Sequence, residues 1–172
     1  TEVYGTITVK GNKYDSKSLT VAVNTTDNAK NKSATKSISS KYDNSVPTAS
    51  MSLSSSMKNN IYNKDVKLSV SVKDVTAGVK SVKYYVTADG KAPTADVWNT
   101  SGKTLFPTGY DTVGTNGKID KQITVSKDFV NSVNGLGAIN VYLQVTDSAN
   151  NTSVISLVDS KKDNTFRIDT VK

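Results

Sequence analysis

The sequence predicts an all-β protein that folds as an antiparallel β-sandwich. Apolar and polar residues alternate over many short stretches, as expected of strands with one face in a core and the other in water. Asn, Gly, Asp and Lys turns separate these stretches, and the 3.6-residue period of amphipathic helices is nearly absent. The hydrophobic content is only 35% of 172 residues, which fits a thin two-layer β module.

Seven short strands follow from this alternation in the later part of the chain. They are expected at residues 49–53, 66–72, 82–86, 123–125, 139–145, 154–158 and 166–168. One short helical turn is predicted at residues 126–133, where a Ser or Asp cap precedes Phe129 and Val133. The regular succession of strands and turns is typical of a sandwich.

One short polar phrase occurs twice, at a constant offset of 120 residues. Residues 26–45 and 146–165 agree at nine of 20 positions without a gap. The identical pairs are Thr26/Thr146, Asp27/Asp147, Ala29/Ala149, Asn31/Asn151, Ser33/Ser153, Ser40/Ser160, Lys41/Lys161, Asp43/Asp163 and Asn44/Asn164. Each copy follows one alternating strand and precedes another, so it is predicted to be the turn of a late hairpin in two related modules.

The chemistry of the repeated phrase suits a turn better than a metal site. Asp27, Asn31, Asp147 and Asn151 are expected to be structural turn residues. The aspartates can accept backbone N–H groups two residues on, and an Asn in the tip tolerates positive φ. A calcium site between modules is the alternative, but calcium needs six to eight oxygen ligands and the phrase supplies one carboxylate. No metal and no cofactor are therefore expected.

The formal charge of +7 does not by itself indicate nucleic-acid binding. All the basic residues except Arg167 are lysines, and they are spread evenly along the chain. Base readout depends on Arg and Asn pairs, and single-strand binding needs aromatic residues among the charges. We therefore expect no nucleic-acid partner. A basic surface suits anionic polymers such as cell-wall teichoic acids, and no apolar run is long enough for membrane insertion.

Catalysis is not expected. The chain has no His and no Cys, which excludes the usual catalytic triads and His-containing metal sites. Its single Glu is Glu2, so paired carboxylates for glycoside hydrolysis would have to come from Asp96 and Asp111. Both aspartates stand in a polar loop, where solvated turn residues are the commoner case.

Residues 88–118 form the longest stretch without alternation, and long irregular stretches are often binding loops. The stretch contains the only Trp, Trp98, together with Phe106 and Tyr110. Two interpretations stay open. In the first, these aromatic side chains and the nearby Asp96, Asn99 and Asp111 bind a sugar ring. In the second, which we favour because aromatic side chains are usually buried, Trp98 and Phe106 cover an open edge of the sandwich.

Several phrases resemble the bacterial Ig-like repeats of Gram-positive surface proteins. They are GVKSVKYYV at residues 78–86, Trp98, INVYLQVTDSANNTS at 139–153 and FRIDTVK at 166–172. The resemblance implies an Ig-like sandwich within a tandem array. The turn glycine of that family is replaced by Lys30 in the first copy and by Asn150 in the second. Left-handed geometry costs a residue such as Lys ~1–2 kcal/mol, so the first turn is expected to differ in type.

The same resemblance implies a domain map. YDNSVPTAS at residues 42–50 resembles the linker between repeats, with Val46 and Pro47 at the joint. Residues 46–172 are then one complete module, and residues 1–45 are the later strands of a preceding, incomplete module. Ile7 and Val9 would match Ile123 and Val125. Some Ig-like domains of Gram-positive adhesins also contain a Lys–Asn isopeptide bond, and a version that depends on Asp stays open here.

Two functional classes remain from the sequence. The first is a stiff spacer, or stalk, of a secreted or cell-surface protein, whose partners are neighbouring Ig-like modules of the same polypeptide. The second is an adhesion or carbohydrate-binding module that uses residues 88–118 to bind a glycan, a cell-wall polymer or a host surface protein, with an S-layer component as a further variant. Both place the protein outside the cell, at the Gram-positive cell wall. A buried Trp98 is expected for the spacer, and an exposed aromatic surface for the binding module.

Overall fold

The computed structural model describes residues 5–10, 18–54, 58–106, 118–128, 138–157 and 165–169. Strands predominate among them, and most strand pairs are antiparallel, which confirms the all-β prediction. The chain divides into two compact units, which we call the N-terminal unit (Thr1–Ser45) and the C-terminal unit (Val46–Lys172). Each unit is described by itself.

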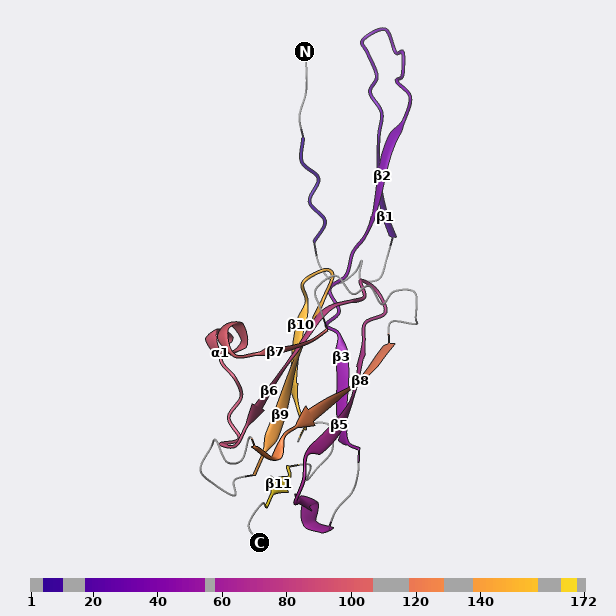
Figure 1. The fold of residues 1–172 in the computed structure, drawn as a ribbon. Coiled ribbons are helices and arrows are strands. Elements are labelled where there is room, and N and C mark those ends of the chain that lie inside the picture. The colour runs from indigo at the N-terminus through magenta and orange to yellow at the C-terminus, as the bar shows by residue number, and fades with distance from the viewer. Residues whose placement is uncertain are drawn as a thin grey trace. The chain divides into compact units, whose positions relative to one another are not determined.

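The N-terminal unit contains one hairpin (Figure 1). Its strands β1 (Ser18–Val23) and β2 (Lys36–Lys41) pair antiparallel, with Val21 opposite Ile38. Residues 5–10 precede the hairpin and form no strand, although Ile7 and Val9 alternate with threonines there. Among the described residues, this unit therefore has a single two-stranded sheet.

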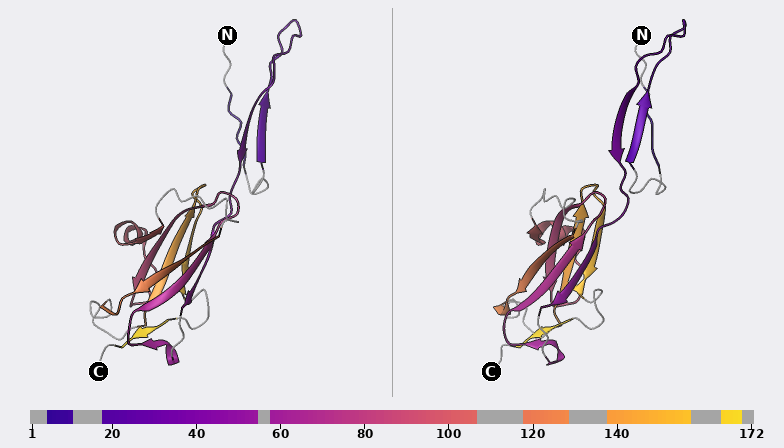
Figure 2. Two further views of the ribbon diagram at one scale, coloured as in Figure 1. Left: turned by 45° about the vertical axis from the view of Figure 1, so that its right-hand side comes forward. Right: turned by 90° about the vertical axis from the view of Figure 1, so that its right-hand side faces the viewer.

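The C-terminal unit is built from two main sheets that lie against each other (Figure 2). The four-stranded sheet has the order β10-β9-β6-β7. Its strands are β6 (Val79–Thr87), β7 (Lys103–Phe106), β9 (Asn140–Asp147) and β10 (Thr152–Ser156). The three-stranded sheet has the order β3-β5-β8, with β3 (Thr48–Leu53), β5 (Val66–Lys73) and β8 (Lys118–Val125).

A short parallel pair closes the end of the C-terminal unit opposite Asp74. Strand β4 (Ile61–Tyr62) follows the 3-10 turn η2 (Lys58–Asn60) and pairs parallel with β11 (Arg167–Ile168). The rings of Tyr62 and Phe166 meet edge to face, with centroids 6.1 Å apart. This pair is the one departure from the antiparallel arrangement that the sequence predicts, within the part of the chain described.

One hydrophobic core lies between the two main sheets. Along β5, Val66, Leu68 and Val70 are buried while Lys67 and Ser69 face solvent, as the alternation predicts. The core also takes in Met51, Tyr62, Val72, Val79, Val82, Ile123, Val125, Ile139, Val141, Leu143, Val145, Leu157, Phe166 and Ile168. Both main sheets contribute, so the unit is sandwich-like.

Each of the seven stretches predicted as strands overlaps a strand, but four elements were not foreseen. They are η2, β4, β7 and the helix α1 (Ala95–Thr100). The last two lie inside residues 88–118, so the expectation of an irregular run is wrong for residues 95–106. Part of the helical turn predicted at residues 126–133 is described: Lys127 and Asp128 are helical. The Asp128 N–H donates to Ser126 Oγ at 3.1 Å. Residues 129–133 lie outside the described residues.

Candidate functional site

The two copies of the repeated phrase fold into the same turn. Asp27 accepts hydrogen bonds from the Asn31 backbone N–H and from Asn31 Nδ2, both at 2.9 Å. Asp147 accepts the matching pair from Asn151, both at 2.8 Å. In each copy the Asp N–H also donates to the Asn carbonyl oxygen at 3.0 Å. The aspartates are turn formers as predicted, although the principal donor lies four residues on rather than two.

The expectation that the first turn differs in type is wrong. Lys30 has φ of 71° and Asn150 has φ of 69°, so both residues take the left-handed conformation that the family glycine would take. The strain on Lys30 is of order ~1–2 kcal/mol. The Asp27–Asn31 hydrogen bonds on either side of Lys30 offset it. These bonds, from the Asn31 side chain first and its backbone second, also lower the pKa of Asp27.

The two hairpins differ by one residue in the strand that follows the Asp–Asn turn. In the N-terminal unit Thr26 pairs with Lys32 and Val23 pairs with Lys36, so the second strand carries one extra residue, a β-bulge. In the C-terminal unit the ladder continues without a shift from the pair Thr146/Thr152 to the pair Leu143/Ile155. Beyond the bulge, the structural counterpart of Ile38 is therefore Leu157 and not Val158. Ser160, Lys161, Asp163 and Asn164 lie outside the described residues.

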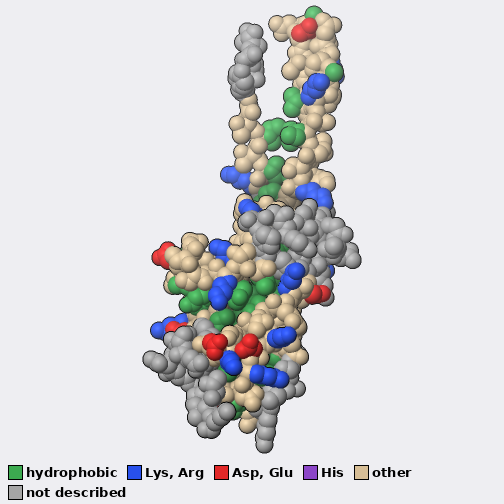
Figure 3. Space-filling view, viewed as in Figure 1, with side chains coloured by type: hydrophobic (Ala, Val, Ile, Leu, Met, Phe, Trp, Pro, Cys, Tyr) green, Lys and Arg blue, Asp and Glu red, His purple; other side chains and the backbone are tan. Residues whose placement is uncertain are grey.

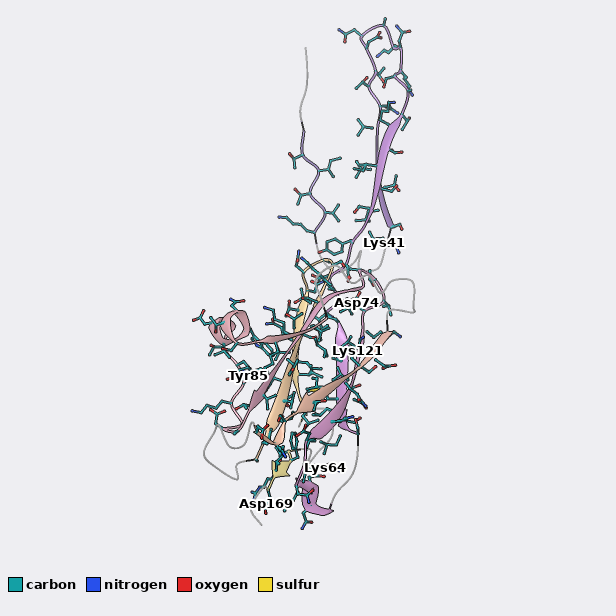
Figure 4. All side chains as sticks on the ribbon, viewed as in Figure 1. Lys41, Lys64, Asp74, Tyr85, Lys121 and Asp169 are labelled. Atoms are coloured by element: carbon teal, nitrogen blue, oxygen red, sulfur yellow. The ribbon has the colours of Figure 1, made fainter. Side chains whose placement is uncertain are left out.

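Buried carboxylates organise the end of the C-terminal unit that carries the turn. Asp74 Oδ1 accepts backbone N–H groups from Thr76, Ala77 and Gly78 at 3.1, 2.9 and 2.8 Å. The Ser148 N–H donates to the Gly78 carbonyl oxygen at 3.0 Å and so joins this loop to the Asp147 turn. Figure 4 shows Asp74 at this end of the unit and Asp169 at the other. Asp74 and Asp147 thus each hold one of two adjoining loops.

The predicted joint residues have different surroundings. Val46 is exposed, whereas Pro47 is buried. The Pro47 carbonyl oxygen accepts a hydrogen bond from Ser153 Oγ at 2.7 Å, which ties the start of the C-terminal unit to β10. Strand β3 begins directly after Pro47, at Thr48. The first residues of this unit are therefore fixed to its sheets rather than joined to them by a flexible tract.

Trp98 does not present its ring to solvent. It lies on α1 with 3% of its surface exposed. A Cβ on Gly102 would lie 2.6 Å from the Trp98 carbonyl oxygen and 3.1 Å from its ring, so only glycine allows this close approach. Stacking on a sugar needs an exposed ring face. The buried ring of Trp98 therefore does not offer a stacking surface.

The other proposed ligand-binding residues do not gather around Trp98. Asp96 and Asn99 are exposed on α1, and Phe106 is the last residue of β7, with a side chain outside the described set. Tyr110 and Asp111 lie outside the described residues. The structure therefore brings none of these residues together with Trp98 into an exposed surface among the positions it describes.

A hollow of about 430 Å³ lies between the end of β6 and the segment that leads to α1. Its lining includes Tyr85, Asp89, Lys91, Pro93 and Thr94. Thr87 Oγ1 donates to Asp89 Oδ1, and this bond, followed by one from the Lys91 N–H at 3.0 Å, lowers the pKa of Asp89. The Tyr142 hydroxyl donates to the Gly90 carbonyl oxygen at 2.7 Å and anchors the loop.

Sequence reasoning did not select this hollow. Its one signal is the phrase TADGK at residues 87–91, in which Gly90 takes a positive φ of 71° and reverses the chain. Asp89 and Lys91 are the two charged residues in its lining. Figure 4 marks Tyr85 on the strand that forms its wall.

One Lys–Asn contact is relevant to whether the chain could form a Lys–Asn isopeptide bond. Lys80 Nζ donates to Asn150 Oδ1 at 2.8 Å, and both residues lie at the surface. Formation of an amide from such a pair requires an uncharged amine, which a dry, buried setting favours and water does not. At this position the contact is therefore a surface hydrogen bond.

No protein-family model matches the chain, and a search of curated proteins finds no similar sequence. Across the ranges that the structure describes, no helix has both the length and the apolar character needed to cross a bilayer.

Proposed function

We propose that the chain is a non-catalytic segment of Ig-like repeats from a secreted or cell-surface bacterial protein, in which it acts as a stiff spacer that presents other domains. The observation that carries this proposal is the Asp–Asn turn, built twice with the same four-residue spacing and the same hydrogen bonds. Duplicated local structure in two compact units is the mark of a repeat array. The partners are neighbouring modules of the same polypeptide.

The side-chain chemistry supports a structural role. The chain has neither His nor Cys, the residues most used as general bases and thiol nucleophiles. The acidic residues Asp27, Asp74 and Asp147 accept backbone hydrogen bonds and hold loops in place. The only Trp is buried, as a spacer requires.

The residues at the predicted joint, Val46 and Pro47, support the proposal of a stiff spacer. Proline fixes its own φ and restricts the residue before it, so Val46-Pro47 is less flexible than a Gly/Ser linker. The Ser153–Pro47 hydrogen bond adds a tertiary anchor on the C-terminal side. A spacer needs such a joint because its reach grows with the number of modules only while each joint stays extended.

Small-angle X-ray scattering tests the spacer role. Two copies of Val46–Lys172 in tandem, joined by residues 42–45, are expected to scatter as an elongated particle. Replacing Val46 and Pro47 by glycine should shorten the maximum dimension and leave thermal melting of each module unchanged. The matched control replaces Lys91 and Ala92, which are exposed in a loop of the same unit, by glycine and should not shorten it. A compact, folded-back particle from the unmodified chain would refute the spacer role.

A second function is favoured by the hollow beside Tyr85. Asp89 and Lys91 in its lining provide charged groups for a glycan or another small polar ligand. Screening the protein on a glycan array tests this role, with Asp89→Ala as the variant that should lose any signal and Asp96→Ala, on the exposed face of α1, as the variant that should keep it. An array without a signal for the unmodified protein would argue against glycan binding.

A further inference from the structure

A basic hollow lies in the C-terminal unit beside the turn between β4 and β5. It has a volume of about 640 Å³. Its lining comes from the segment after β3, the turn before β5, the start of β5 and the segment after β8, and consists of Ser54, Asn63, Lys64, Asp65, Lys67 and Lys127. All six residues are exposed. Figure 4 places Lys64 at the end of the unit opposite Asp74.

Hydrogen bonds hold together the segments that line this hollow. The Lys127 backbone N–H donates to Asp65 Oδ1 at 2.9 Å, which joins the segment after β8 to the turn before β5. The Ser54 N–H donates to the Lys67 carbonyl oxygen at 2.8 Å, and the hydroxyl oxygens of Ser54 and Ser69 lie 3.0 Å apart. The lysines therefore project from backbone that the fold already fixes, so an anion does not have to order these segments when it binds.

The charge balance at the hollow is positive. Among the residues that line it, three are lysines and Asp65 is the one acid. Asp128 follows Lys127 in the sequence and adds a second carboxylate nearby. Residues 55–57 and 129–137, which adjoin this region in the sequence, contain no charged residue. Figure 3 shows Lys and Arg side chains, with acidic ones among them, on the surface of the C-terminal unit. A positive cluster of this kind raises the local concentration of anions.

A trough rich in hydroxyl groups continues from the basic hollow along the outer face of the three-stranded sheet. Small side chains leave two further hollows over this face, of about 540 and 290 Å³, and both are lined by Ser50 and Ser71. Lys73 lies at the far end of β5, about 20 Å from Lys67 along the strand. The cross-strand pairs between β3 and β5 on this face are Thr48/Lys73, Ser50/Ser71 and Ser52/Ser69. The trough thus has hydroxyls along its length and lysines at both ends.

The chemistry of this face favours a charged chain over a neutral sugar. The residues that line the three hollows include no aromatic side chain, so a sugar ring has no stacking surface among them. A lysine ammonium binds phosphate oxygens as a compact point charge. Serine hydroxyls both donate and accept hydrogen bonds, so they suit a ligand that carries hydroxyls of its own. Asp120 on β8 lies opposite Ser71 and directs an anionic ligand toward β3 and β5.

We infer that Lys64, Lys67 and Lys127, together with the trough over β3 and β5, form a binding surface for a linear anionic polyol. In such a polymer, phosphodiester groups alternate with carbons that carry hydroxyls. The phosphodiester groups contact the lysines at the two ends of the trough, and the hydroxyls exchange hydrogen bonds with the serines between them. This inference goes beyond the spacer role and does not depend on it, because it concerns one face of one module and not the joint.

Calorimetric titration of the full 172-residue chain tests the inference. The probe is a synthetic glycerol phosphate oligomer long enough to reach from Lys67 to Lys73. It is expected to bind, with an affinity that falls as salt is added. Neutral polyglycerol of the same length should not bind, and polyphosphate, which has the charge without the hydroxyls, should bind several-fold more weakly. Failure of the glycerol phosphate oligomer to bind, or equal affinity for a single-stranded oligonucleotide of the same charge, would overturn the inference.

Two triple variants with the same change in charge locate the basic hollow. Lys64→Gln, Lys67→Gln and Lys127→Gln together should weaken binding of the glycerol phosphate oligomer by about tenfold or more, because they remove the phosphate contacts. The control is the combination of Lys32→Gln, Lys36→Gln and Lys41→Gln, three exposed lysines of the N-terminal unit, and should leave the affinity unchanged. Equal losses in the two variants would mean that the oligomer responds only to the net charge of the chain, and the proposed surface would be wrong.

A third variant tests the hydroxyls of the trough. Ser50→Val and Ser71→Val together remove two facing hydroxyls, and valine suits a strand position. This variant should bind the glycerol phosphate oligomer several-fold more weakly and polyphosphate as well as the unmodified chain does. An unchanged affinity for the glycerol phosphate oligomer would show that the serines do not contact the ligand.

Discussion

The hairpins β1–β2 and β9–β10 have the same turn in different surroundings. In β9–β10 the apolar side chains lie in the core, and Leu143 and Leu157 have no exposed surface. In β1–β2 the corresponding Val23 and Ile38 are largely exposed. Because the turn geometry is the same in both, it depends on the Asp–Asn hydrogen bonds and not on burial. A closed turn of this kind therefore does not require a buried hairpin around it.

The largest expected difference between the hairpins lies in their apolar residues. Leu157→Ala should destabilise the C-terminal unit by about 2–5 kcal/mol, because it removes buried methyl groups and leaves a cavity. Ile38→Ala should change the stability of the N-terminal hairpin by less than about 0.5 kcal/mol, since the side chain is already in water. Hydrogen exchange of the Asn151 and Asn31 amides measures both. Equal losses in the two variants would mean that Ile38 is packed in solution.

A smaller difference is expected at the left-handed position. Lys30→Gly should stabilise the first turn by about 1 kcal/mol, because glycine takes positive φ without strain. Asn150→Gly should bring no gain, since Asn tolerates this conformation and the substitution removes the hydrogen bond from Lys80. Exchange rates of the Asn31 and Asn151 amides report each turn. A larger gain in the second turn would contradict the assignment of strain to Lys30.

The smallest expected effect is the pH dependence of the exposed turn around Asp27. Hydrogen bonds from Asn31 lower the pKa of Asp27 in the folded turn below the ordinary value of 3.8. The stabilisation is therefore fully present above that ordinary value and is lost as the pH falls through the lowered pKa of the folded state. The chemical shift of the Asn31 amide should titrate below pH 3.8, and Asp27→Asn should abolish this titration. A midpoint above pH 3.8 would show that the turn does not favour the charged carboxylate.

The strands of the C-terminal unit were predictable because their signal is local. Alternation of Val66, Leu68 and Val70 with Lys and Ser is visible in the sequence, and one buried face is enough to produce it. The sequence also predicts a strand at residues 166–168, where β11 forms, but it contains no signal for β4 or for the parallel pairing of the two strands. Both strands are short and far apart in the sequence, so only the folded core brings Ile61 to Arg167.

The elements around Trp98 were missed for a different reason. Helix α1 has only six residues, too few to show a helical period, and its N-cap Thr94 is one of many threonines in a polar stretch. The prediction of a different type for the first turn was wrong because it considered the backbone preference of Lys30 without the hydrogen bonds around it. The cost of positive φ at Lys30 is a property of one residue, whereas the compensating bonds join Asp27 to Asn31. The hollow beside Tyr85 depends on where the loop after β6 is placed, and its one sequence signal, the turn at residues 87–91, does not indicate a cavity.

The β4–β11 pair also dictates an order of folding. The β1–β2 hairpin closes over a short stretch of chain, and local contacts of this kind form quickly. In the C-terminal unit, Asn60 bonds to Thr165 and Ser153 bonds to Pro47, across 105 and 106 residues. During synthesis on the ribosome, β3 and β5 must wait for β9 and β11 with their apolar faces uncovered. The lysines and serines that alternate with those faces then keep the nascent strands in solution until the last partner arrives.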